Sequence, residues 1–112
     1  MSRGTAIAVL FLASLLEAGG DALMRLALKG QYQVAGRLGL FAAGAVVLFS
    51  YGWLVNAPPW DFGRLLGLYV VFFFVTVQLL SWLVFGQPPT RAIWMGGVLI
   101  VGGGLVMTFA GQ

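Results

Sequence analysis

The chain has 112 residues, of which 61% are hydrophobic and only 8% are charged, and its mean hydropathy is +1.00. A soluble domain carries about 25% charged residues, so this composition predicts an integral membrane protein. Cysteine and histidine are absent, which excludes disulfides and sites built on thiolate or imidazole ligands, and the net charge of +3 comes from six basic residues at the ends of apolar segments. We therefore expect no metal, no cofactor and no nucleic-acid partner.

Four apolar segments approach or exceed the roughly 20 residues that span a bilayer. Paired prolines end the second and third segments, because proline lacks the amide donor that a helix needs, and Thr90 is a suitable N-cap for the fourth. The connections are too short to hold another domain. The predicted fold class is an all-α membrane protein, a single four-helix domain over residues 1–112, with helices at about 5–28, 38–55, 64–85 and 91–109. Because so thin a bundle has little interior, we expect it to dimerise.

Three charged residues, Glu17, Asp21 and Arg25, interrupt the first helix at four-residue spacing. On a helix they lie on one stripe about 80° wide, and because charge in hydrocarbon is costly the stripe should face protein or water. Glu17 is the candidate carboxylate for a proton or a cation; the alternative is a carboxyl that bonds within the bundle or holds a partner subunit. Asp21 either pairs with Arg25 one turn later or adds a second acid to the site.

Further candidate residues are polar side chains within the apolar helices. Ser14 lies one turn before Glu17 and is a candidate hydrogen-bond partner of a protonated carboxyl or of a substrate. Tyr69 brings a hydroxyl to one face of the third helix and is expected to line any substrate site. For Gln78 the alternatives are an interhelical hydrogen bond and a substrate contact.

Glycines on the fourth helix suggest where a second copy would pack. Gly96 and Gly103 are one heptad apart and fall on one helix face. In lipid, helices associate through small residues that let their backbones approach closely. We therefore predict a dimer interface at these two glycines.

Several of these motifs resemble those of the small multidrug resistance family. The first helix carries its pattern of a membrane glutamate followed by glycine and a Leu-Met-basic triplet, in Glu17, Gly20 and Leu23-Met24-Arg25. The end of the third helix, Leu79-Leu80-Ser81-Trp82 followed by Phe85-Gly86-Gln87, and the glycine step on the fourth helix are also similar to that family. Residues 63–90 are similar as well to the YnfA-like small membrane proteins, a related group in the drug/metabolite transporter superfamily.

The resemblance covers nearly the whole chain and implies a specific function. Members of the small multidrug resistance family are antiparallel homodimers of the bacterial cytoplasmic (inner) membrane, in which two membrane glutamates share one central site. Protons and a cationic substrate compete for that site, which gives proton antiport and efflux of quaternary ammonium compounds, guanidinium or polyamines. The resemblance assigns this role to Glu17, with a second copy, protons, a small cation and the lipid bilayer as partners.

Two departures from the family pattern keep a second function open. Leu66 and Tyr69 stand where the family has a tyrosine and a tryptophan, and Val71-Phe72-Phe73 replaces its Gly-x-Gly hinge. One interpretation is a small homodimeric secondary transporter centred on Glu17; the alternative is a non-transporting accessory or structural subunit of a larger membrane complex, which packs through its stiff aromatic third helix. We expect no enzymatic activity, because the sequence shows no nucleophile–base pair and no phosphate-binding motif.

Overall fold

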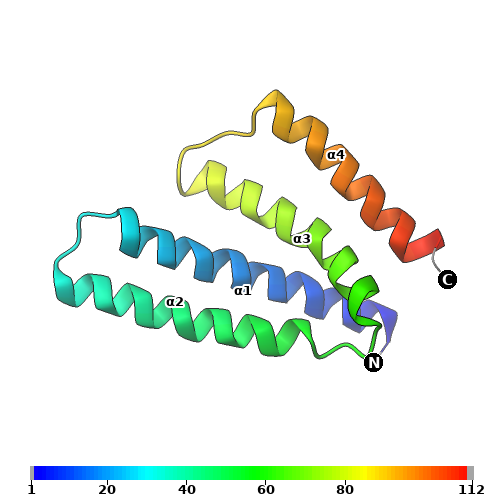
Figure 1. Ribbon diagram of the computed structural model, residues 1–112, viewed down its shortest axis with the longest axis horizontal. Coiled ribbons are helices and arrows are strands. Elements are labelled where there is room, and N and C mark those ends of the chain that lie inside the picture. Colours follow the sequence, from blue (N-terminus) through cyan, green and yellow to red (C-terminus); the bar gives the residue numbers. More distant parts are fainter. Residues whose placement is uncertain (1, 111–112) are drawn as a thin grey trace.

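The computed structural model describes residues 2–110, and the regular structure in this range is entirely helical. Each helix, with the closing π-helical turn counted into the last, is long and apolar enough to cross a membrane, which confirms the predicted class. Figure 1 shows α1 and α2 side by side, α3 diverging from α1 toward its own C-terminal end, and α4 at the outer edge. The elements are α1 (Arg3–Lys29), α2 (Val34–Val55), α3 (Phe62–Leu83), α4 (Arg91–Leu105) and the π turn (Val106–Ala110).

The helix ends follow from local chemistry. α2 begins at Val34, four residues before the predicted start, because the stretch ahead of residue 38 contains a single helix-weakening residue, Gly36, which costs about 1 kcal/mol. α3 ends at Leu83, and the chain then reverses through Gly86 at φ +65°, a left-handed conformation that glycine adopts without steric cost. The predicted cap of α4 is confirmed, since the Thr90 side chain accepts a hydrogen bond from the Ile93 amide at 3.2 Å.

The α1–α2 pair is held at close range by glycines. A Cβ atom added to Gly20 would lie 2.7 Å from the Leu48 side chain and 3.4 Å from the Gly44 carbonyl oxygen. A Cβ atom on Gly44 would in turn lie 3.3 Å from the Gly20 oxygen. Both positions must therefore stay small for the two backbones to approach as they do, as expected for helices that associate in lipid.

α3 packs on the other side of α1, and α4 packs on α3 alone among the helices described. The buried apolar cluster between α1, α2 and α3 lies toward the N-terminal half of α1 and consists of Leu10, Ala13, Val55, Leu65, Leu68 and Tyr69. This cluster fixes α3 against α1 near the start of both helices. It thereby sets the position of the polar side chains one or two turns further along.

Candidate functional site

Glu17 lies near the middle of α1, about 21 Å along the axis from Arg3 and about 18 Å from Lys29. Its side chain is partly buried and accepts a hydrogen bond from the Tyr69 hydroxyl of α3, with 2.8 Å between Tyr69 Oη and Glu17 Oε1. An acid at this depth is costly unless protein groups or water satisfy it. The structure therefore brings together Glu17 and Tyr69, which the sequence indicates as site candidates on the first and third helices.

Tyr69 is the organising side chain of this site. It is 4% exposed, and its hydroxyl lies 3.3 Å from the Ala13 carbonyl oxygen as well as close to Glu17. Its ring stacks on Phe73 at 6.1 Å between centroids and packs at 5.7 Å against Tyr51 of α2. The hydroxyl has one proton, and two acceptors lie near it. It can therefore donate a well-aligned hydrogen bond to the carboxylate or to the backbone carbonyl, but not to both at once.

Tyr51 is a site residue that the sequence analysis missed. It places a second phenol beside Tyr69, so that α2 contributes to the Glu17 site together with α1 and α3. The signal available in the sequence was weak: Tyr51 is a phenol in the mostly apolar C-terminal half of α2, adjacent to Ser50. Helical periodicity does not tell which way such a ring points.

A second polar contact joins α1 to α3 one turn before Glu17. The hydroxyls of Ser14 and Thr76 lie 3.1 Å apart, and both residues are buried. Ser14 also donates to the Phe11 carbonyl oxygen at 2.6 Å, the short-range bond typical of serine in membrane helices. Ser14 is thus occupied by Phe11 and Thr76, and Glu17 is served by Tyr69 instead.

Asp21 and Arg25 line a cavity of about 310 Å³ between the C-terminal halves of α1 and α3. The Arg25 guanidinium lies over the Phe85 ring, 5.5 Å from its centroid. Within residues 2–110 no carboxylate oxygen lies within 4.0 Å of a lysine or arginine nitrogen, so Asp21 does not form the expected pair with Arg25. The remaining polar groups of this cavity come from Ser81 and Gln87.

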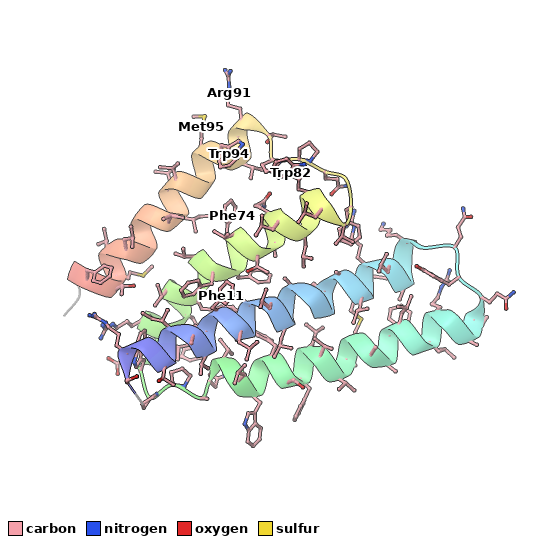
Figure 2. The ribbon with its side chains drawn as sticks, turned by 180° about the vertical axis from the view of Figure 1, so that it is seen from behind. Phe11, Phe74, Trp82, Arg91, Trp94 and Met95 are labelled. Carbon is pink, nitrogen blue, oxygen red and sulfur yellow. The ribbon has the colours of Figure 1, made fainter. Side chains whose placement is uncertain are left out.

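Gln78 lies apart from the other candidates. Nine residues separate it from Tyr69, and at about 100° per residue this turns it to the opposite side of α3. There it lines a groove of about 150 Å³ between α3 and α4, together with Phe74, Trp82 and Trp94 (Figure 2). Gln78 therefore does not contribute to the Glu17 site within one chain.

The α4 glycines divide into two faces. A Cβ atom on Gly97 would lie 2.7 Å from the Phe74 ring, and one on Gly104 would collide with Val71, so these two glycines carry the α3–α4 contact. Gly96 and Gly103 have nothing within 4 Å of an added Cβ atom and lie on the open face of α4. The predicted dimer stripe is thus free within the chain, and its role stays a prediction.

The chemistry of the site follows from its charges. Glu17 accepts a hydrogen bond from a tyrosine, and no lysine or arginine nitrogen of the described residues lies within 4.0 Å of its carboxylate. In the part of the chain that the structure describes, no three His, Cys, Asp or Glu side chains gather as a metal site requires. The arrangement suits reversible binding of a proton or an organic cation.

A family model described as "Uncharacterised BCR, YnfA/UPF0060 family" matches residues 5–112. The match spans all four helices and includes both Glu17 and Tyr69. The resemblance to the YnfA-like small membrane proteins is thereby confirmed. Comparison with curated proteins and with solved structures gives no match.

Proposed function

The chain belongs to the YnfA/UPF0060 family, and we propose that it is a small secondary transporter of the bacterial inner membrane that exchanges protons for a cationic substrate at Glu17. The observation that carries this proposal is the 2.8 Å contact between Tyr69 Oη and Glu17 Oε1, made at mid-helix and without a basic partner among the described residues. A carboxylate with a purely structural role would be stabilised in the membrane by an ion pair with a lysine or arginine of the same chain.

The Tyr69 hydroxyl can form a hydrogen bond with Glu17 in either protonation state of the carboxyl group. When Glu17 is ionised, the hydroxyl donates to the carboxylate. When Glu17 is protonated, its own O–H can donate to the Tyr69 oxygen, and the Tyr69 O–H can then donate to the Ala13 carbonyl oxygen 3.3 Å away. The same three groups therefore have two complete hydrogen-bond arrangements, one for each protonation state.

The working unit in this proposal is a homodimer. Four helices leave Glu17 only partly buried, and a second copy would enclose it and add its own glutamate. The open Gly96–Gly103 face of α4 offers a surface for close helix approach. Dimerisation through these glycines would leave the α3–α4 contact at Gly97 and Gly104 intact.

The accessory-subunit alternative needs a free aromatic surface on α3. Phe73 is stacked on Tyr69, and Phe72 makes an edge-to-face contact with Phe11 at 6.1 Å. Val71 packs toward Gly104 of α4. The residues that replace the family's glycine hinge are engaged inside the chain, and this supports transport over docking to a larger complex.

The test measures cation binding by the purified protein in detergent. Equilibrium dialysis gives the amount of cation bound, and a pH indicator in a weakly buffered medium gives the protons released. Tetraethylammonium, guanidinium and spermidine serve as probes. Wild type should bind at least one of them, release protons as it does so, and bind more weakly as the pH falls. Glu17→Gln should abolish the proton release, whereas Asp61→Asn, which alters an exposed acid at the start of α3, should leave it unchanged.

Absence of cation binding at every pH, or equal proton release from wild type and Glu17→Gln, would overturn the proposal. Co-purification of the chain with a large membrane complex would then favour the accessory role.

A further inference from the structure

The cavity beyond Glu17 carries two opposite charges that do not neutralise each other. Asp21 and Arg25 are one helical turn apart, a spacing at which an acid and a base ordinarily pair. Here no Asp21–Arg25 ion pair forms within the described chain, and both side chains line the same space of about 310 Å³. Each charge is therefore available to a ligand.

The geometry keeps the two charges apart. The Arg25 guanidinium is drawn over the Phe85 ring, 5.5 Å from its centroid, at the end of the cavity formed by the chain following α3. Asp21 lies one turn nearer to Glu17. One turn of helix rises about 5.4 Å, so the cavity presents a negative group and a positive group a few ångströms apart along its length.

Neutral polar groups gather at the basic end. Ser81 donates to the Gln87 carbonyl oxygen at 3.2 Å and lies 3.4 Å from the Gln87 side-chain oxygen, which holds the amide group at the cavity wall. The NH₂ group of that amide has no hydrogen-bond acceptor among the described residues, so it can donate to an anion beside Arg25. A guanidinium and an amide donor form a good carboxylate-binding pair.

The walls between the charged ends are apolar, formed mainly by Ala18, Ala22, Phe73, Val77 and Leu80. Phe73 also stacks on Tyr69, so the cavity adjoins the Glu17 site through a shared ring. Its volume is at the small end of the range for ligand pockets, which suits a compact molecule with an apolar body.

We propose that this cavity binds a compact zwitterion of the apolar amino-acid type, with the ammonium group at Asp21 on the side of Glu17 and the carboxylate at Arg25 and Gln87. This inference rests on the proposed function and specifies its substrate class: the substrate bears a carboxylate in addition to its ammonium group, and Arg25 recognises that carboxylate. A substrate with a positive charge alone would leave Arg25 unused and should therefore bind more weakly than a zwitterion of similar size.

The experiment measures equilibrium binding of alanine, valine, leucine, methionine and phenylalanine to the purified full-length protein in detergent. The tightest binder is then compared with two matched analogues, its amide, which lacks the negative charge, and its deaminated acid, which lacks the positive one. We expect the zwitterion to bind at least about tenfold more tightly than either analogue. Arg25→Gln should remove this preference over the amide, Arg25→Lys should retain part of it, and Asp21→Asn should remove the preference over the deaminated acid.

Gln78→Leu, on the opposite side of α3, is the control and should change none of these affinities. Circular dichroism and gel filtration of each variant establish that it folds as wild type does. If none of the five amino acids binds more tightly than its amide, or if Arg25→Gln leaves the ratio unchanged, the inference is wrong. In that case, if adding tetraethylammonium, guanidinium or spermidine still causes a proton release that depends on Glu17, the proposed exchange of protons for a cation holds even though the amino-acid proposal fails.

Discussion

The α3–α4 contact gives a sharp prediction, because adjacent glycines on α4 face opposite surroundings. In Gly104→Ala the new Cβ atom collides with Val71, and because a helical valine keeps one side-chain rotamer about 90% of the time, Val71 cannot turn aside. Overpacking of this kind costs about 1–3 kcal/mol. In Gly103→Ala the new Cβ atom meets nothing within 4 Å. Both changes gain the same helix propensity, so the free energies of unfolding of the two variants should differ by the overpacking cost alone.

The assay is reversible unfolding in mixed micelles, followed by tryptophan fluorescence and circular dichroism at a protein-to-micelle ratio low enough to keep the chain monomeric. Gly104→Ala should be the less stable variant by about 1–3 kcal/mol. The double variant Val71→Ala, Gly104→Ala should recover much of that loss, because the smaller side chain vacates the space of the new Cβ atom. Equal stability of Gly103→Ala and Gly104→Ala, or no recovery in the double variant, would refute the assigned rotation of α4.

Three further predictions concern the polar contacts and the open glycine face. Tyr69→Phe removes the hydroxyl bound to Glu17 but keeps the ring, so it should lower the free energy of unfolding by about 1–3 kcal/mol in the same assay, and no change would contradict the 2.8 Å hydrogen bond. A double-mutant cycle of Ser14→Ala and Thr76→Val should give a coupling of about 0.6 kcal/mol, the average for hydrogen bonds between membrane helices, whereas zero coupling would mean that the two hydroxyls do not interact. Gly103→Leu should reduce chemical cross-linking between copies in liposomes. Gly39→Leu, which changes an open glycine on α2, is the control and should not, and equal cross-linking of the two variants would show that Gly103 is not in the interface.

The helices and the position of the acid could be predicted from sequence because they depend on local properties. Hydropathy and the paired prolines located four membrane-spanning helices, and charge spacing placed Glu17, Asp21 and Arg25 on one stripe. The sequence also singled out Tyr69 as a polar-tipped ring on one face of the third helix, whereas its contact with Glu17 depends on the packing of α3 on α1. These inferences need only the composition of each segment and the angle of 100° per residue.

Other features required the arrangement of helices in space. Periodicity gives the angular order of residues around a helix but not the rotation of that helix toward its neighbours. For this reason the sequence could not show that Gly97 and Gly104, rather than Gly96 and Gly103, contact α3, or that Gln78 faces away from Glu17.

The partners of individual side chains were also decided only by tertiary structure. Ser14 bonds Thr76 and Tyr51 joins Tyr69 because α1, α2 and α3 converge around the apolar cluster at the start of α1. Arg25 lies over Phe85 because the end of α3 reaches the same level as the last turns of α1, which draws the guanidinium away from Asp21. The sequence by itself determined which segments enter the membrane and which charged residues lie within them. Helix packing determined which side chains contact those charges, since contacts between different helices, such as Ser14 with Thr76 at 62 positions apart, have no signature in local periodicity.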